Sequence, residues 1–110
     1  MDAAFFTVDV EDWYQAYRLR YGQTCTDMSA RFPVQLEAIL DLLAESSVLA
    51  TFFCLGRTIE QAPGLARKIV DAGHEIQSHG YGHRRVYNCT PGEFKDDVLH
   101  AKKLIEDITG

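Results

Sequence analysis

The sequence predicts an α/β fold in which parallel strands alternate with helices. Three short segments, at residues 3–10, 50–55 and 75–78, have strand character, and a helical pattern follows each of them along the chain. Strands joined in this way run parallel and are connected by right-handed crossovers. In such folds ligands bind at the carboxyl ends of the strands. The residues directly after the three strands are therefore the first place to search for a site.

The bulk properties indicate a single domain over residues 1–110. Of its 110 residues 46% are hydrophobic and 25% are charged, which is typical of a globular domain with a modest core. The net charge is -5, and the acidic residues are spread along the chain. This distribution offers no basic surface for nucleic acid or an anionic membrane, so a nucleic acid is not an expected partner.

The amino terminus predicts neither a signal peptide nor a transmembrane segment. It has no positively charged region, and Asp9 interrupts its short apolar run. We therefore expect a cytoplasmic location. The cysteines Cys25, Cys54 and Cys89 are odd in number and never spaced C-x-x-C, which argues against a disulfide framework or a thiolate zinc site. Cys54 lies inside an apolar strand and is expected to pack in the core.

The first third of the chain is predicted to hold one strand and one helix. Residues 3–10 form an apolar run without a breaker, as expected for a strand buried on both faces of a sheet. Residues 13–30 mix aromatic and polar side chains without a clear period, which predicts a long loop with about one helical turn. Such a loop could line a sugar-binding cleft, or it could only cover the end of the sheet. Residues 32–44 show helical spacing of leucine and isoleucine, with Ser29 near the amino-terminal cap and Pro33 in the first turn.

The remaining elements follow from their boundary residues. The strand at 50–55 is followed by Gly56, and short helices are expected at 58–62 and 64–72, on either side of Pro63. Gly73 suits the left-handed position after a helix, before the strand at 75–78. The segment 90–93, Thr-Pro-Gly-Glu, has capping-box spacing, and an apolar stripe continues from it through Phe94, Val98, Ala101, Ile105 and Ile108. His100 lies off this stripe and is expected at the surface.

Two histidines give the strongest chemical signal. His79 and His83 follow the third strand on a loop that contains Gly80 and Gly82, and their imidazoles could converge on one ion from a helical turn or from a wide loop. A pair of this spacing also arises by chance as solvated surface histidines. An acidic cluster after the first strand, Asp9-Val10-Glu11-Asp12, could supply an oxygen ligand. Two histidines and one carboxylate form a recurrent catalytic metal site.

Three motifs together resemble the polysaccharide deacetylase family, carbohydrate esterase family 4. They are residues 7–13, Thr-Val-Asp-Val-Glu-Asp-Trp; residues 50–53, Ala-Thr-Phe-Phe; and residues 73–83, Gly-His-Glu-Ile-Gln-Ser-His-Gly-Tyr-Gly-His. The resemblance covers nearly the whole chain, and the acidic motif resembles the branch associated with bacterial exopolysaccharide gene clusters. It implies that the chain forms the N-terminal part of a distorted (β/α) barrel.

The resemblance also implies roles for individual residues. Asp9 matches the catalytic base, and His79 and His83 match the two metal-binding histidines. The third ligand stays open between two acids: the ungapped alignment favours Glu11, whereas the usual residue type, an aspartate, favours Asp12. The implied cofactor is a divalent metal ion, with zinc expected first, and the implied reaction removes N-acetyl groups from an amino-sugar polysaccharide.

The chain departs from the family after its third strand-helix unit. The family's later motifs supply an arginine that orients the base and a histidine that protonates the leaving amine, and neither has a match before Gly110. We therefore expect an N-terminal fragment of the catalytic domain. Two other classes stay open: a non-catalytic metal- or carbohydrate-binding module, and a flavodoxin-like signalling domain in which Glu11 and Asp12 hold magnesium. The third strand of the latter would be followed by a phosphorylatable aspartate, where this chain has Ser78-His79.

Overall fold

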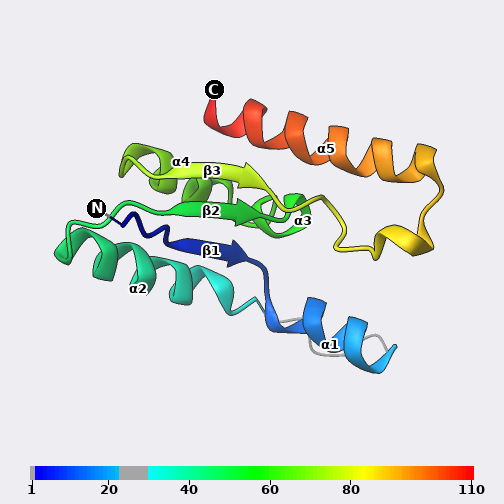
Figure 1. The fold of residues 1–110 in the computed structure, drawn as a ribbon, viewed down its shortest axis with the longest axis horizontal. Coiled ribbons are helices and arrows are strands. Elements are labelled where there is room, and N and C mark those ends of the chain that lie inside the picture. Colours follow the sequence, from blue (N-terminus) through cyan, green and yellow to red (C-terminus); the bar gives the residue numbers. More distant parts are fainter. Residues whose placement is uncertain (1, 23–29) are drawn as a thin grey trace.

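Three parallel strands form the sheet of the computed structural model, which describes residues 2–22 and 30–110. The strands β1 (Thr7–Val10), β2 (Thr51–Cys54) and β3 (Glu75–Ser78) lie side by side in the order β1-β2-β3 (Figure 1). Their registers pair Thr7 with Thr51 and Thr51 with Glu75, so the carboxyl ends of all three strands are level. The predicted α/β fold with parallel strands is confirmed.

The helices connect the strands in an order typical of the start of a (β/α) barrel. They are α1 (Trp13–Tyr21) and α2 (Phe32–Glu45) before β2, α3 (Gly56–Ile59) and α4 (Pro63–Asp71) before β3, and α5 (Pro91–Thr109) after a 3-10 turn at Val86–Asn88. When consecutive strands are neighbours and every crossover has the same hand, the covering helices lie on one face of the sheet. Figure 1 shows α4 behind the strands, with α2 below and α5 above them.

The hydrophobic core lies between one face of the sheet and the helices α2, α4 and α5. Phe52 and Cys54 of the central strand are 0% exposed. They pack in one cluster with Leu36 of α2, Ile69 of α4 and Ile105 of α5. Burial raises the pKa of the Cys54 thiol to about 12, so this thiol stays protonated and packs as an apolar side chain. The predicted core role of Cys54 is confirmed.

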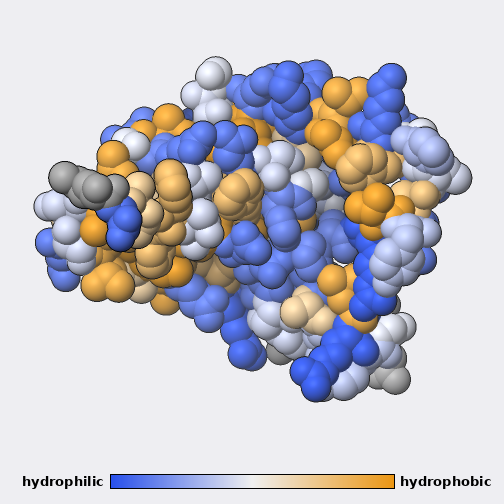
Figure 2. All heavy atoms as spheres, in the orientation of Figure 1, coloured by the Kyte–Doolittle hydropathy of each residue, from blue (hydrophilic) through white to orange (hydrophobic). Residues whose placement is uncertain are grey.

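The opposite face of the sheet is open. Alternation along β1 turns Asp9 away from the core, and the side chain of Asp9 is exposed. Just before β1, Phe5 is 90% exposed and Phe6 is 51% exposed. The prediction that this strand is buried on both faces is therefore wrong, because no helix of the described residues covers its second face. Figure 2, in the same view, shows hydrophilic residues over the middle of the molecule and hydrophobic ones gathered near the amino terminus.

The helix α1 replaces most of the predicted loop after β1. Asp12 caps its amino terminus, and the side chain of Gln15 bonds back to the Asp12 backbone to complete a capping box. Gly22 ends the helix in the left-handed conformation, with φ of +64°. The Asp-x-x-Gln spacing was the sequence signal for this helix, and the loop prediction missed it. Residues 23–29, which include Cys25 and the predicted cap residue Ser29, lie outside the described residues.

The helices α4 and α5 lie close to their predicted positions, whereas α3 (Gly56–Ile59) begins and ends earlier than the segment 58–62 predicted for it. The Thr90 side chain accepts a hydrogen bond from the Glu93 backbone, and the Glu93 carboxylate accepts one from the Thr90 backbone, so the predicted capping box of α5 is confirmed. Gly73 follows α4 with φ of +88°, as predicted. The predicted apolar stripe of α5 is buried only toward its carboxyl end, because Phe94 and Val98 are 43% and 38% exposed. Within the described ranges, none of the helices combines the length and apolarity that crossing a bilayer requires.

Candidate metal centre

One carboxylate and two imidazoles converge at the carboxyl end of the sheet. The Glu11 Oε2 atom lies 3.4 Å from His79 Nε2 and 2.9 Å from His83 Nε2. One ligand atom from each residue lies within 4.8 Å of the others. Glu11 directly follows β1, and the histidines lie on the loop after β3. We call this group the Glu11-His79-His83 triad, and it lies where the sequence places its candidates.

The surroundings of the triad fit a divalent cation. Two of its buried atoms, Glu11 Oε2 and His83 Nδ1, have no hydrogen-bond partner among the described residues. A buried polar atom without a partner costs free energy, and a cation would satisfy this oxygen together with the two histidine nitrogens that face it. The side chains of Glu11, His79 and His83 are 29%, 31% and 20% exposed, which leaves the group accessible from solvent. The donor set of one carboxylate and two imidazoles suits zinc and other first-row divalent ions.

Backbone hydrogen bonds hold the histidine loop, residues 79–83, against the segment that follows β2. The His79 N–H donates to Cys54 O over 2.9 Å, and the Gly56 N–H donates to Gly80 O over 2.9 Å. The Arg57 N–H donates to Tyr81 O over 3.1 Å. These bonds continue the pairing of β2 with β3 beyond the regular sheet. The loop therefore has a defined position despite its glycines.

A carboxylate on α5 fixes the other side of the histidine loop. The Tyr81 N–H donates to Asp97 Oδ2 over 2.9 Å, and the Gly82 N–H donates to Asp97 Oδ1 over 3.1 Å. Gly80 takes φ of +78°, and a Cβ there would lie 3.0 Å from Asp97 Oδ2. His83 itself is left-handed, with φ of +56°, a conformation that non-glycine residues adopt mostly where the surroundings enforce it. Sequence reasoning missed Asp97, because α5 carries several acidic residues and the sequence does not single out this one.

Asp12, one of the two acids predicted as the third ligand, does not belong to the triad in the structure. Asp12 is 3% exposed, and its Oδ1 accepts the Trp13 N–H at the start of α1 over 2.8 Å. Its Oδ2 accepts the N–H groups of Arg31 and Phe32, over 2.7 Å and 3.1 Å, at the start of α2. Both oxygens are thus used by two helix amino termini, whose positive dipole ends favour a carboxylate. Of the two acids that the sequence left open, the structure groups Glu11 with the histidines.

Asp9, the candidate base, lies on the same side of β1 as Glu11. Residues two apart in an extended chain project to one face, and the intervening Val10 is 3% exposed in the core. The Asp9 side chain is exposed on the open face of the sheet. Its carboxylate is therefore free to meet a substrate or a water molecule at this face.

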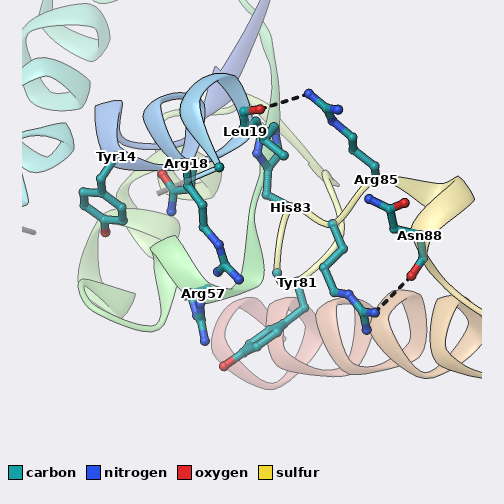
Figure 3. A pocket seen from close by; sticks show the side chains of 12 residues that line it. Tyr14, Arg18, Leu19, Arg57, Tyr81, His83, Arg85 and Asn88 are labelled. Atoms are coloured by element: carbon teal, nitrogen blue, oxygen red, sulfur yellow. Dashed lines mark hydrogen bonds between the residues drawn. The ribbon is translucent and has the colours of Figure 1, made fainter. Parts of the chain in front are cut away.

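A cavity of about 380 Å³ adjoins the triad and shares His83 with it (Figure 3). Its walls come from α1, α3 and the chain from Tyr81 to Asn88. Four arginines line it: Arg18, Arg57, Arg84 and Arg85. Residues 13–30 were expected either to line a cleft or to cover the end of the sheet. Within this segment, α1 contributes Tyr14, Gln15, Arg18 and Leu19 to the cavity wall. The convergence of arginines from three separate segments had no signal in the sequence.

Comparison with known proteins adds relatives of defined activity. A family model described as polysaccharide deacetylase matches residues 20–110, a range that contains both histidines of the triad. A chitooligosaccharide deacetylase of Bradyrhizobium sp. is 39% identical over 67 residues, which are 61% of this chain and 31% of that protein. A peptidoglycan deacetylase of Helicobacter pylori is 36% identical over 77 residues, which are 70% of this chain and 26% of that protein. The chain thus spans about a third or less of the length of these two relatives.

Solved structures share the fold. A carbohydrate esterase family 4 pseudoenzyme from Bacillus anthracis superposes with a TM-score of 0.70 at 28% identity, over 96% of this chain and 31% of that one. A deacetylase solved with substrate superposes with a TM-score of 0.71 at 25% identity, over 96% of this chain and 43% of that one. The α/β arrangement therefore recurs in proteins with a deacetylase activity and in a relative named as a pseudoenzyme.

Proposed function

The chain belongs to the polysaccharide deacetylase family, and from this premise we propose that it serves in the metal-dependent removal of N-acetyl groups from an amino-sugar polysaccharide of the exopolysaccharide type. The observation that carries the proposal is the Glu11-His79-His83 triad, whose facing atoms lie 2.9 Å and 3.4 Å apart at the carboxyl end of the sheet. Asp9 projects from β1 on the same side as Glu11. This arrangement supports a metal site with Asp9 as its carboxylate base at one edge of the fold.

Each residue has a separate role in the proposed reaction. Glu11, His79 and His83 would hold the ion, which we propose to be zinc and which would supply Lewis-acid polarisation of the acetamide carbonyl. The Asp9 carboxylate would accept a proton from the water that attacks the acetamide carbon; the C–N bond then breaks to give acetate, and that proton goes to the leaving amine. The open face of the sheet beside Asp9 gives the sugar access to this edge. The hydrogen bonds from the Tyr81 and Gly82 backbone to Asp97 hold the histidine loop in place between the two imidazoles.

A zinc titration tests the proposed metal centre. We expect calorimetry to show about one equivalent bound by the wild-type chain and none by a His79→Ala, His83→Ala double variant. His100→Ala is the matched control, because His100 is exposed and stacks on Tyr81 with 4.0 Å between ring centroids, outside the triad. A folded wild-type chain that binds no zinc, or a double variant that binds it as well as the wild type, would refute the metal centre.

A second candidate function is metal binding without turnover. It is favoured by the similarity to a pseudoenzyme, because a shared fold does not carry activity with it. Amine release from an N-acetylglucosamine oligomer separates the two functions, measured with the zinc-loaded chain and with the complete gene product if that is longer. Release that disappears in Asp9→Asn supports the deacetylase. Zinc binding with no release from either protein supports the binding module.

Asp97→Asn is expected to weaken zinc binding by up to about tenfold, the lower end of the range for partners that bond the ligands themselves, because Asp97 bonds the loop backbone and not the imidazoles. An asparagine has only one oxygen to accept the N–H groups of Tyr81 and Gly82, so one anchor of the histidine loop is lost. The matched control is Asp96→Asn, whose exposed carboxylate is the neighbour on the same helix. Calorimetry with zinc measures the difference, and equal affinities for the two variants would show that the Asp97 anchor does not orient the ligands.

A further inference from the structure

We propose that the arginine-lined cavity binds an oxyanion carried by the saccharide, so that the substrate is an acidic rather than a neutral polysaccharide. This inference rests on the proposed function, because it assigns the substrate class of the same site. His83 belongs to the triad and also lines the cavity. A sugar whose acetamide lies at the triad could therefore place a neighbouring acidic group among the arginines.

The charge of the cavity is unusual for this protein. The chain has 16 acidic and 11 basic residues, yet four arginines and no aspartate or glutamate are among the described residues that line the cavity. Like charges that share a concave site repel one another, and the repulsion is relieved when an anion binds between them. Because the chain already carries a net charge of -5, its solubility does not require a cluster of arginines in this cavity. The arrangement therefore points to an anionic ligand.

Two of the four guanidinium groups have no carboxylate partner among the described residues, and one of them, that of Arg57, interacts with the Tyr81 hydroxyl. Arg85 is held by the cavity rim, since its Nη1 donates to Tyr87 Oη over 2.8 Å and its Nη2 donates to Leu19 O over 3.0 Å. Arg84 Nη2 lies 3.7 Å from Glu93 Oε2, so its charge is partly balanced. Arg18 and Arg57, by contrast, form no ion pair with any acidic residue that the structure describes.

Arg18 and Arg57 also have suitable positions. They extend from α1 and α3 into the same cavity (Figure 3). The Arg57 backbone is tied to the histidine loop through its N–H bond to Tyr81 O. The Tyr81 ring completes this wall, and its hydroxyl donates to Glu60 Oε2 over 2.8 Å. Planar guanidinium groups bind carboxylate, phosphate and sulfate oxygens through paired hydrogen bonds, so the shared chemistry is an oxyanion on a sugar.

Binding of matched acidic and neutral sugars tests the inference. The probes are a tetrasaccharide of alternating glucuronate and N-acetylglucosamine, N-acetylglucosamine 6-phosphate, inorganic phosphate and a neutral N-acetylglucosamine tetramer. We expect the wild-type chain to bind at least one of the two acidic sugars about tenfold or more tightly than the neutral tetramer, since charged hydrogen bonds are lost with the neutral probe. The acidic sugar that binds more tightly identifies the oxyanion as a carboxylate or a phosphate.

Two double variants with the same charge change provide the control. Arg18→Gln, Arg57→Gln should remove the preference for the acidic sugar, whereas Arg20→Gln, Arg67→Gln should retain it, because Arg20 and Arg67 do not line the cavity. Equal affinity of the wild type for acidic and neutral sugars would overturn the inference. So would binding of inorganic phosphate alone, or a preference that survives in the Arg18, Arg57 variant.

The test also separates this inference from the proposed function. Zinc calorimetry on the Arg18, Arg57 variant should give wild-type affinity, because neither arginine belongs to the triad. Zinc binding without an acidic preference would refute the cavity assignment and leave the metal centre intact. An acidic preference in a chain that binds no zinc would refute the metal centre and leave an anion-binding cavity.

Discussion

Glu11→Gln is expected to weaken zinc binding by about a hundredfold, the upper end of the range for outer partners of metal ligands, while leaving the fold intact. The Glu11 Oε2 atom faces both histidine nitrogens, and a neutral amide would replace the only carboxylate of the triad. The side chain is partly exposed, and the contacts of its Oε2 atom within the described residues are those with the two histidine nitrogens, so the change falls on the proposed ligand set rather than on the packing of the fold. Calorimetry with zinc measures the loss, and circular dichroism checks the fold.

Asp12→Asn is the matched variant, since it makes the same chemical change one residue further on. We expect zinc affinity close to that of the wild type and a fall in the free energy of unfolding of about 1–3 kcal/mol. An asparagine keeps one oxygen that accepts hydrogen bonds, so the N–H groups that Asp12 bonds at the start of either α1 or α2 lose their acceptor. A folded Asp12→Asn that loses zinc, beside a Glu11→Gln that keeps it, would reverse the assignment of the third ligand.

The sequence could not resolve these two acids, because the choice depends on where β1 ends and which way the chain then turns. Val10 is the last residue of β1. The Glu11 side chain therefore still faces the side of the sheet away from the core, whereas Asp12 caps the amino terminus of α1. Strand boundaries are uncertain by more than this one residue when they are read from a pattern. The capping-box spacing of Asp12 and Gln15 indicates a helix that begins after Asp12. The mixed aromatic and polar composition of residues 13–21 instead led to the prediction of a loop.

Signals between residues close in the sequence predicted most of the fold. They could not predict which side chains from distant segments lie in contact. The helices α2 and α5 were predicted because apolar spacing, Pro33 and the Thr90 cap act within one or two turns of the chain. The two histidines were found because they lie four residues apart. Arg18, Arg57 and Asp97 had no such signal, because the sheet and its crossovers decide which of the charged residues meet.

Phe52→Ala is expected to lower the free energy of unfolding by about 3–5 kcal/mol, a large part of the stability of a domain of this size. Phe52 is 0% exposed on the central strand, and its ring lies 5.2 Å from that of the buried His74. Phe5→Ala removes the same atoms from a side chain that is 90% exposed, and it should change the stability by less than about 0.5 kcal/mol. Urea unfolding followed by circular dichroism measures both variants.

The same substitution should also weaken the metal centre, because β2 joins the two strands that carry it. Glu11 follows β1 and the histidines follow β3, and both strands pair only with β2 in this sheet. Loss of packing under β2 therefore separates the carboxylate from the imidazoles before any ligand is altered. We expect zinc affinity to fall in Phe52→Ala and to stay unchanged in Phe5→Ala. Wild-type zinc affinity in an unfolded Phe52→Ala chain would show that the histidine pair binds the ion without the sheet, and the argument that the fold assembles the triad would fail.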